Sequence, residues 1–335
     1  MPGGSSPTSL IFKLRYKKVI QMSIKVGIPQ ALLYHEFGGF WLDFFRNSGV
    51  PVALSGETNK QILDRGTSLA IDESCIPLKV YLGHVDSLLA TCSHIFVPRV
   101  AQYYPGYHLC AKLAGLPDIV QNTFRLANKE LISPNIENKL HTTMLRAVHT
   151  ICQPLGLSVI TGHQAYHQAL KQWRGVIPTK ASSSARAKIA VIGHSYIIKD
   201  VFFSGEVETF FKSQNVDIIT LGDLPNKSIY EEAKAFQQDI YWQLSMKIAG
   251  ATQYFCRQPD IAGIIMVSSF GCGPDSLVNE YLEHHVLRPS SKPYMVINID
   301  EHTGNAGLVT RVEAFWDMVE RRLKIEGKLP SHGLS

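Results

Sequence analysis

The sequence predicts an α/β protein made of two doubly wound domains, each built around a parallel sheet. Short apolar segments typical of strands alternate with helical segments along most of the chain, which is the pattern of parallel βαβ units. The alternation stops at a small, polar stretch, residues 179–186, and restarts after it. The length of 335 residues also suits two domains, since domains usually contain roughly 100–200 residues.

The first domain is predicted at residues 23–180. Its opening strand stops at Pro29, and its first helix ends before Gly49, a typical C-cap residue. A mostly helical insertion is expected at residues 124–172. The other expected elements are, in chain order, strand 24–28, helix 34–47, strand 50–54, helices 59–70 and 76–90, and strands 94–100 and 119–123.

The second domain is predicted at residues 187–330. It follows the polar linker and closes with an amphipathic helix. Because both domains show the same alternation, they could be distant copies of one plan. The expected elements are strand 188–193, helix 203–214, strand 216–221, a long helix 230–250, strands 261–268 and 293–299, and helix 310–326.

Residues 1–22 are predicted to be an N-terminal extension that is either disordered or not native, with translation starting at Met22. Four basic residues lie in this extension, which contains no acidic residue before Met22, and they account for most of the net charge of +5. The rest of the chain is therefore near neutral, which argues against a nucleic-acid partner. No apolar run reaches the roughly 18 residues needed to span a membrane.

The cysteine content indicates a cytoplasmic protein. Six cysteines are too few for a disulfide scaffold, and the first residues lack the pattern of a secretory signal. In a reducing compartment, a cysteine in a motif is more often a metal ligand or a catalytic group than half of a disulfide. No CxxC pair is present, so the usual zinc-ribbon, ferredoxin and thioredoxin signatures are absent.

Cys272 is the strongest candidate for a metal ligand. It follows the strand at 261–268, and ligands bind beyond the carboxyl ends of parallel strands. Gly271 and Gly273 on either side would let the backbone approach a bulky inorganic group, and with Ser269 they are predicted to bind the cofactor. The helix expected after Pro274 would offer free N–H groups to an anion. A structural cysteine in a tight turn is the alternative.

Cys75 and Cys110 are the two further candidate ligands. Cys75 precedes a helix that has Pro77 in its first turn, and a helix N-terminus favours the thiolate. Cys110 follows the strand at 94–100 and a loop rich in Tyr, Pro and Gly. With Cys272 these thiols lie 35 and 162 residues apart and can meet only in the folded chain. Three thiolates would leave one iron of a cubane open to a substrate. A buried structural cysteine remains possible at each position.

The segment from Asp300 to Gly304 is expected at the same edge of the sheet. Glu301 and His302 could transfer protons, and Thr303 could cap a helix or contact the cofactor. Helix capping and solvated charge are the alternative. Other residues receive structural predictions: Cys92, Cys152 and Cys256 as small core residues, His163 and His167 as surface histidines, and Tyr241 and Trp242 as core aromatics.

Six short segments together resemble the 2-hydroxyacyl-CoA dehydratases and their activase-related proteins, including a domain of unknown function found in large CoA-enzyme activases. They span residues 24–320, nearly the whole chain. One departure is Ala111, where the family usually has proline after the second cysteine. The segments are Val26–Tyr34, Asp72–Lys79, Ile95–Arg99, Gly115–Asp118, Ser268–Ser276 and Asp300–Gly304.

The resemblance implies two Rossmann-like domains with an iron–sulfur cluster at their interface. The cluster would be a 4Fe-4S cluster, or a double-cubane 8Fe-9S cluster, held by Cys75, Cys110 and Cys272. The resemblance also implies low-potential electrons from an ATP-dependent activase, which would be a separate chain because no actin-like ATPase signature is present. A second cluster-bearing subunit or a homodimer is a further expectation.

Three functions remain open. The chain could catalyse reductive, radical-type chemistry on an acyl-CoA or another small molecule, as a dehydratase-like lyase or a reductase component. It could be an accessory electron-transfer protein without its own substrate, or an α/β ligand-binding module without a cluster. Iron and sulfide analysis of oxygen-free protein separates the last from the others, and turnover with a reduced activase and ATP separates the first two.

Overall fold

The computed structural model describes residues 24–126, 130–137, 141–173, 185–236, 239–303 and 305–329. The predicted extension at residues 1–22, most of the predicted linker and Gly304 lie outside this part of the chain. We refer to residues 24–173 as the N-terminal lobe and to residues 185–329 as the C-terminal lobe. The predicted domain boundaries at residues 180 and 187 stay predictions.

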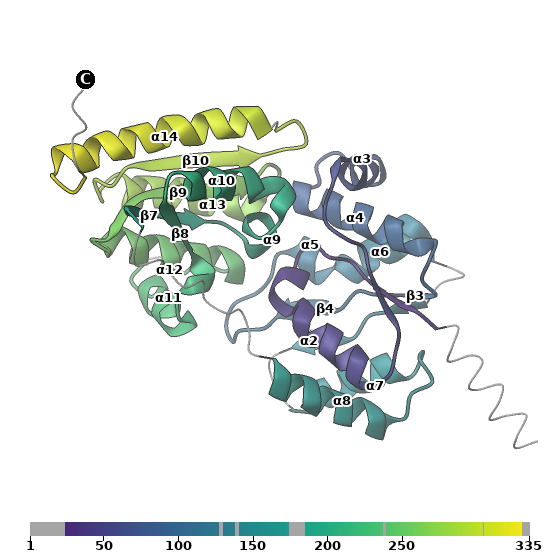
Figure 1. Cartoon of the computed structure of the whole chain (residues 1–335). Helices are drawn as coiled ribbons and strands as arrows, with labels where there is room; N and C mark the ends of the chain where they lie inside the picture. Colours follow the sequence, from purple (N-terminus) through teal and green to yellow (C-terminus); the bar gives the residue numbers. More distant parts are fainter. Residues whose placement is uncertain are drawn as a thin grey trace, which may run out of the picture.

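The chain folds into two lobes (Figure 1), each with a four-stranded parallel sheet. The two sheets have the same strand order. The order is β2-β1-β3-β5 in one and β8-β7-β9-β10 in the other, so the second strand of each lobe lies at one edge and the first beside it. The prediction of an α/β fold with parallel sheets is confirmed. The strands are β1 (Val26–Ile28), β2 (Val52–Leu54), β3 (His94–Phe96), β5 (Glu130–Ile132), β7 (Ala187–Ile192), β8 (Val216–Thr220), β9 (Ile261–Ser269) and β10 (Tyr294–Ile299).

Helices flank the sheets, and a small parallel pair, β4 (Arg99–Gln102) and β6 (Asn135–Glu137), extends the N-terminal lobe. Its helices are α2 (Tyr34–Asn47), α3 (Lys60–Leu69), α4 (Ile76–Leu89), α5 (Ala111–Ala114), α6 (Leu116–Phe124), α7 (His141–Cys152) and α8 (Val159–Gln172). The C-terminal lobe contains α9 (Ser195–Ile198), α10 (Val201–Ser213), a 3₁₀ turn (Leu221–Asp223), α11 (Asn226–Ala233), α12 (Gln243–Arg257), α13 (Gly273–Leu282), a π-helical turn (Glu283–Leu287) and α14 (Asn305–Ile325).

Two sequence expectations about elements are wrong. Residues 119–123 belong to helix α6, not to a strand, because Pro117 opens a helix whose buried face includes Val120. The long helix expected at 230–250 is two helices, α11 and α12, which begin and end apart. In addition, the region 124–172 contains β5 and β6 as well as helices.

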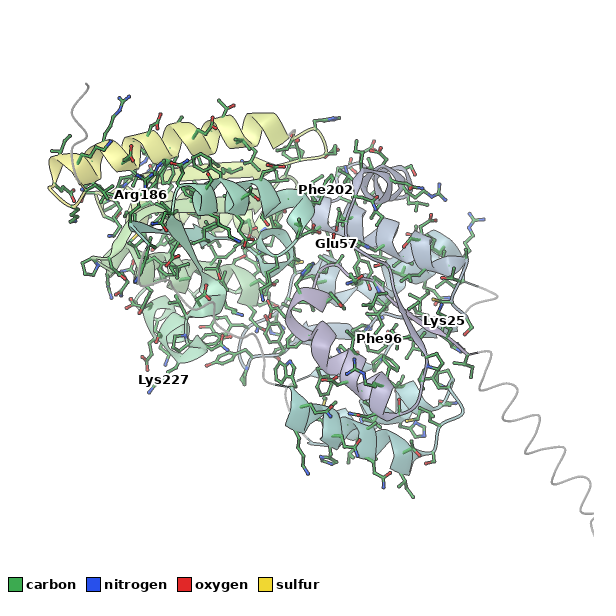
Figure 2. The ribbon with its side chains drawn as sticks, viewed as in Figure 1. Lys25, Glu57, Phe96, Arg186, Phe202 and Lys227 are labelled. Carbon is green, nitrogen blue, oxygen red and sulfur yellow. The ribbon has the colours of Figure 1, made fainter. Side chains whose placement is uncertain are left out.

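The apolar core continues from one lobe to the other. Side chains of α4 such as Ile76 and Leu82 belong to the same buried cluster as Ile189 of β7 and Tyr196 of α9. Cys92 and Cys152 are buried in apolar clusters, as expected. Tyr241 is 58% exposed, so its expected place in the core is wrong. Figure 2 shows side chains of the two lobes meeting near Glu57 and Phe202.

Helix α4, which follows Cys75, is held tightly against α3. A side chain at Gly66 would collide with the carbonyl oxygen of Lys79, 1.8 Å from the ideal Cβ position. A side chain at Gly83 would collide with the carbonyl oxygen of Ile62, at 2.0 Å. The two glycines thus allow backbone-to-backbone packing that fixes the position of α4.

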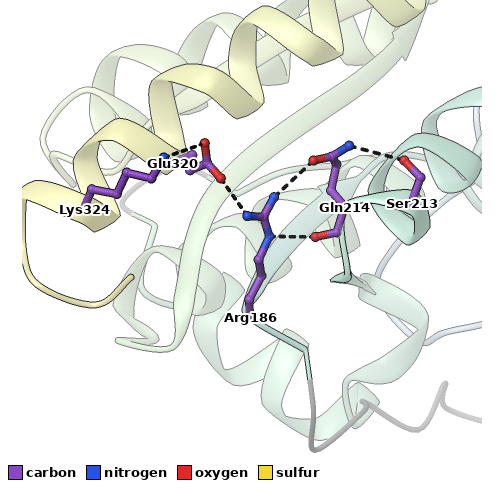
Figure 3. Close-up of polar contacts among 5 residues, drawn as sticks. All are labelled: Arg186, Ser213, Gln214, Glu320 and Lys324. Atoms are coloured by element: carbon purple, nitrogen blue, oxygen red, sulfur yellow. Dashed lines mark hydrogen bonds and ion pairs between the residues drawn. The ribbon is translucent and has the colours of Figure 1, made fainter. Parts of the chain in front are cut away.

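Arg186 joins the start of β7 to two helices of the C-terminal lobe (Figure 3). Its guanidinium donates to the carbonyl oxygen of Gln214 at 2.7 Å and to Glu320 at 2.7 Å, and it lies over the ring of Trp316. Lys324 donates to the other oxygen of Glu320. No helix in the described part of the chain is long and apolar enough to cross a bilayer.

Candidate functional site

The three candidate cysteines share one local setting, because each is the residue immediately before a helix. Cys75 precedes α4, Cys110 precedes α5 and Cys272 precedes α13, all with extended backbones. Pro77 and Pro274 lie in the first turns of α4 and α13, where the missing N–H costs no helical hydrogen bond. The predicted helix starts after Cys75 and Cys272 are confirmed.

Cys272 lies close to Cys75 across the two lobes. Gly271 has φ +77°, a left-handed conformation that glycine adopts without strain. A Cβ on Gly271 would lie 3.2 Å from the Cα of Cys75 and 3.4 Å from its amide nitrogen. Glycine at 271 is therefore required both by the turn and by the backbone of Cys75. Gly273, at the start of α13, has open space around its Cα.

Electrostatic coupling indicates that Cys110 belongs to the same neighbourhood. Burial raises the pKa of Cys110, and the nearby Cys75 thiol raises it further. Tyr196 is buried, and its pKa is raised first by burial, then by Asp275 and by all three cysteines. Because charge–charge interactions weaken with distance, this single hydroxyl must lie near the three thiols.

The helix N-termini do not make the thiols of Cys110 and Cys272 acidic. Burial raises the pKa of Cys272 far above its ordinary value, and the neighbouring carboxylate of Asp275 raises it further. Desolvation also outweighs the hydrogen bonds that backbone N–H groups give to Cys110. Without a metal, both cysteines are therefore neutral thiols rather than activated nucleophiles.

A compact group of possible metal ligands surrounds Cys272, and two of its members differ from the predicted set. Atoms of His194, Cys272 and Asp275 all lie within 4.8 Å of one another, the one such group of three in the described residues. The Nε2 atom of His194 lies 2.9 Å and 2.8 Å from the two carboxylate oxygens of Asp275, and Ser245 donates to the same carboxylate at 3.2 Å.

This group is buried, and its carboxyl group ionises more readily than usual. Asp275 is 1% exposed and His194 4% exposed. Burial opposes ionisation of Asp275, yet the charge of His194 and the hydrogen bonds from His194, Cys272 and Ser245 hold its pKa below the usual value. Sequence reasoning missed His194, although it follows β7 at the sheet edge where ligands were expected.

The predicted segment after β10 reaches the interface through one residue. Glu301 forms an ion pair with the buried Lys79 of α4, Nζ to Oε1 3.0 Å. His302 is exposed, and the hydroxyl of Thr303 hydrogen-bonds Asp300 in a local turn. Ser269 is buried, and its hydroxyl has no hydrogen-bond partner among the described residues. Proton transfer by Glu301 and His302 and cofactor contacts by Ser269 and Thr303 stay predictions.

A cavity of about 1060 Å³ lies between the lobes. It is lined by α2 and the chain after β4 on one side, and by α9, the 3₁₀ turn and α12 on the other. None of the three candidate cysteines lines it. This cavity was not predictable from the sequence, because its residues come from distant segments and carry no common motif.

Parallel sheets in both lobes, with three thiols before helices where the lobes meet, define an α/β protein with a candidate cofactor site. Its sequence matches the family model of the CoA enzyme activase uncharacterised domain (DUF2229) over residues 25–224. This match covers more than half of the chain, so the protein belongs to that family, as the motif resemblance predicted. The matched region includes Cys75 and Cys110, whereas Cys272 lies beyond its end.

No curated protein matches this chain in sequence. Among solved structures, the chain is similar to a protein described as a phosphosugar isomerase from Silicibacter pomeroyi, with 8% identity over 93% of this chain and 90% of that chain. The TM-score is 0.20, which is too low to carry an argument about fold or function.

Proposed function

We propose that this protein binds an iron–sulfur cluster through Cys75, Cys110 and Cys272 and serves low-potential electron transfer or reductive chemistry linked to CoA enzyme activation. The observation that carries the proposal is the common neighbourhood of three cysteines that are far apart in sequence. Cys272 and Cys75 approach through Gly271, and Tyr196 is coupled to all three thiols. A 4Fe-4S cluster is the simplest occupant, and a double-cubane 8Fe-9S cluster is the larger one.

The donor chemistry fits such a cluster. Thiolates are the ligands that iron–sulfur clusters use. A single zinc ion with sulfur ligands at about 2.3 Å would require ligand atoms within roughly 4 Å of one another. The three cysteines do not form such a close group in the described residues, whereas a cluster holds its ligands further apart. Because burial keeps Cys110 and Cys272 protonated, loading would release their protons.

When bound, the cluster would supply one-electron chemistry at low potential. The chain itself would supply a water-poor setting, because Tyr196, Asp275 and Ser269 are buried around the cysteines. Gly271 and Gly273 leave backbone N–H groups uncovered by side chains. The Lys79–Glu301 ion pair would keep the lobes together beside Cys75.

Membership of the family supports the partners that we propose. Membership among CoA enzyme activase domains supports an ATP-dependent activase, on a separate chain, as the electron donor. A second cluster-bearing subunit or a second copy of this chain, and an acyl-CoA or other small substrate, belong to the same proposal. If the protein turns over no substrate, its role is that of an accessory electron carrier.

Iron and acid-labile sulfide analysis of protein purified without oxygen tests the proposal. We expect about four irons and four sulfides per chain, or about eight irons for a double cubane, and an electron paramagnetic resonance signal after reduction. Replacing Cys75, Cys110 or Cys272 by alanine should each abolish the cluster. Cys256→Ala is the matched control and should keep it, because Cys256 lies in the C-terminal lobe near Ser290. Colourless, iron-free protein would refute the proposal.

A second candidate is a single metal ion on His194, Cys272 and Asp275, which the short distances among these three residues favour. The two candidates differ in stoichiometry and in the residues they need. A single ion would give about one metal per chain without sulfide, would be lost in His194→Ala, and would persist in Cys110→Ala. A cluster would be lost in Cys110→Ala.

A further inference from the structure

The cavity between the lobes contains a largely buried lysine side chain that makes no hydrogen bond with the described residues. Lys247 of α12 lines the cavity, and its side chain is 12% exposed. Its nearest acidic group is Glu36 of α2, at 3.8 Å, which is beyond hydrogen-bonding distance. Within the described residues its ammonium group thus donates no hydrogen bond. An ammonium in this state is costly to bury, so it would gain from an added acceptor.

Glu36 is the counter-charge of Lys247, but the hydrogen bonds to its carboxylate come from neutral donors. Ser195 donates to one oxygen at 3.0 Å, and Tyr103 donates to the other at 3.1 Å. All these residues line the cavity, and they come from both lobes. Neither hydrogen bond involves Lys247, so in the described part of the chain the ammonium group of Lys247 can still donate to a ligand.

A second lysine adds positive charge to the same cavity. Lys199 lines it, and its side chain makes no hydrogen bond or ion pair with the described residues, although Glu36 and Asp223 lie near enough to favour its charge. Asp223, the other acidic residue of the lining, accepts hydrogen bonds from the backbone N–H and hydroxyl of Thr220 in its own turn. Burial lowers the pKa of Lys199, so a nearby anion would favour its charged form.

The rest of the lining is mostly apolar and aromatic. Phe37, Trp41, Tyr166 and Trp173 are among the rings that face the cavity. A volume of about 1060 Å³ is at the upper end of small-molecule sites, which are typically apolar with a few placed polar groups. The combination suits a molecule with an apolar body and an anionic end.

We propose that this cavity binds a small organic acid, with its aromatic or aliphatic body against the ring-lined wall and its carboxylate at Lys247 and Lys199. The site contains none of the three candidate cysteines, so the proposal does not depend on a cluster. A ligand held by both lobes would also favour the arrangement in which they meet.

Calorimetric titration with matched acids and amides tests the charge requirement. The probes are 3-phenylpropanoate, hexanoate and indole-3-acetate, each paired with its uncharged amide. We expect at least one acid to bind tenfold or more tightly than its amide, since hydrogen bonds to charged groups contribute about 1.5–3 kcal/mol. Binding should also change the fluorescence of Trp41 and Trp173, which line the cavity.

Lysine variants test where the carboxylate of the bound acid lies. Lys247→Met should remove the preference for acid over amide, and Lys199→Met should reduce it if Lys247→Met does not fold. Lys227→Met is the control, since the side chain of Lys227 is 86% exposed at the periphery of the C-terminal lobe and does not line the cavity, although the preceding Asn226 does (Figure 2). Cys272→Ala should bind the acid as wild type does, whatever the fate of the cluster. Equal or absent binding of every acid and amide, or a preference retained in both lysine variants, would overturn the proposal.

Discussion

The ammonium group of Lys79 lies 3.0 Å from a carboxylate oxygen of Glu301, and this ion pair joins helix α4 to the chain that follows β10. The two partners differ in burial, because the side chain of Lys79 is 6% exposed and that of Glu301 is 24% exposed. Replacing Lys79 and replacing Glu301 should therefore lower the free energy of unfolding by different amounts. The pair lies one turn after Cys75 in α4.

We predict that Glu301→Gln destabilises the protein more than Lys79→Met does. The first change leaves a buried ammonium without its counter-charge, which we expect to cost about 2–4 kcal/mol. In the second, methionine fills much of the lysine volume and Glu301 can still be hydrated, so the cost should be about 1 kcal/mol or less. Urea unfolding of both variants measures the difference.

The double variant separates structure from catalysis at Glu301. If Glu301 only balances Lys79, then combining Glu301→Gln with Lys79→Met should restore most of the lost stability and any activity. Recovery of stability without recovery of activity would support the predicted proton-transfer role of Glu301. Equal costs for the two single changes would contradict the electrostatic interpretation.

His84 lies in a chain of hydrogen bonds that crosses the lobe interface. Its Nε2 atom lies 3.0 Å from the hydroxyl of Thr58, which donates to Asp200, and its Nδ1 atom lies 2.8 Å from the hydroxyl of Ser55. Because the Thr58 hydroxyl donates to Asp200, it accepts from Nε2–H, so Nδ1 accepts from Ser55. The neutral imidazole suits both contacts, whereas a second ring proton would require the Ser55 hydroxyl to change from donor to acceptor.

We predict that stability falls as the pH is lowered from about 6.5 toward 4. Burial, and then the charge of His35, lower the pKa of His84 to about 4, so the unfolded chain takes up the proton first. Above pH 6.5 the neutral His84 adds nothing to the pH dependence. Between pH 6.5 and 4 its protonation in the unfolded chain lowers the free energy of unfolding, by at most about 3 kcal/mol. Urea midpoints at pH 7, 5.5 and 4.5 measure it.

Two variants assign this pH dependence. His84→Gln should flatten the slope only in part, because the pKa of the buried His35 is also lowered to about 4. His302→Gln is the control and should leave the slope unchanged, since His302 is exposed. A slope that persists fully in His84→Gln would show that other groups control acid stability.

Sequence periodicity predicted the strands of the parallel sheets except β5, because the predicted strands lie between turn or helix signals that local chemistry sets. The failures occurred where burial by distant residues decided the outcome. Ile119 and Val120 have strong strand propensity, yet Pro117 and the packing of Val120 make that segment helical. Tyr241 has a core-type side chain but lies in the exposed chain just before α12.

The candidate site was predictable only where local sequence signals encode it. Glycine beside Cys272 and proline after Cys75 are local signals, so these cysteines could be placed before helices from sequence alone. The pairing of Asp275 with His194 depends on the parallel register of β7 and β9. No local signal encodes that contact, and the same holds for Lys247 opposite Glu36.

Close packing of α3 against α4 gives a sharp test of how α4 is positioned. We predict that Gly83→Ala destabilises the protein by about 2 kcal/mol or more, because the new Cβ would lie 2.0 Å from the carbonyl oxygen of Ile62. Thermal unfolding measures the loss. Gly39→Ala in α2 is the matched control, with nothing within 4 Å of the added atom. It should stabilise the helix by up to about 1 kcal/mol, since alanine is the better helix former.

If helix α4 must be held for the cysteine site to form, Gly83→Ala should also lower the metal content of oxygen-free protein. Gly39→Ala should leave the metal content unchanged. A Gly83→Ala variant as stable as wild type would mean that α3 and α4 can separate at little cost.

Arg186 ties the first strand of the C-terminal lobe to its last helix, through Gln214, Glu320 and the ring of Trp316 (Figure 3). We predict that Arg186→Lys lowers the free energy of unfolding by about 1–3 kcal/mol although the charge is retained. An ammonium group cannot donate in two directions from one plane or stack on the indole as a guanidinium does. Urea unfolding monitored by Trp316 fluorescence measures the loss.

Arg257→Lys is the control, because Arg257 makes one exposed ion pair with Glu232 and should lose less than about 0.5 kcal/mol. Equal losses in the two variants would mean that the planar geometry of Arg186 contributes nothing beyond its charge.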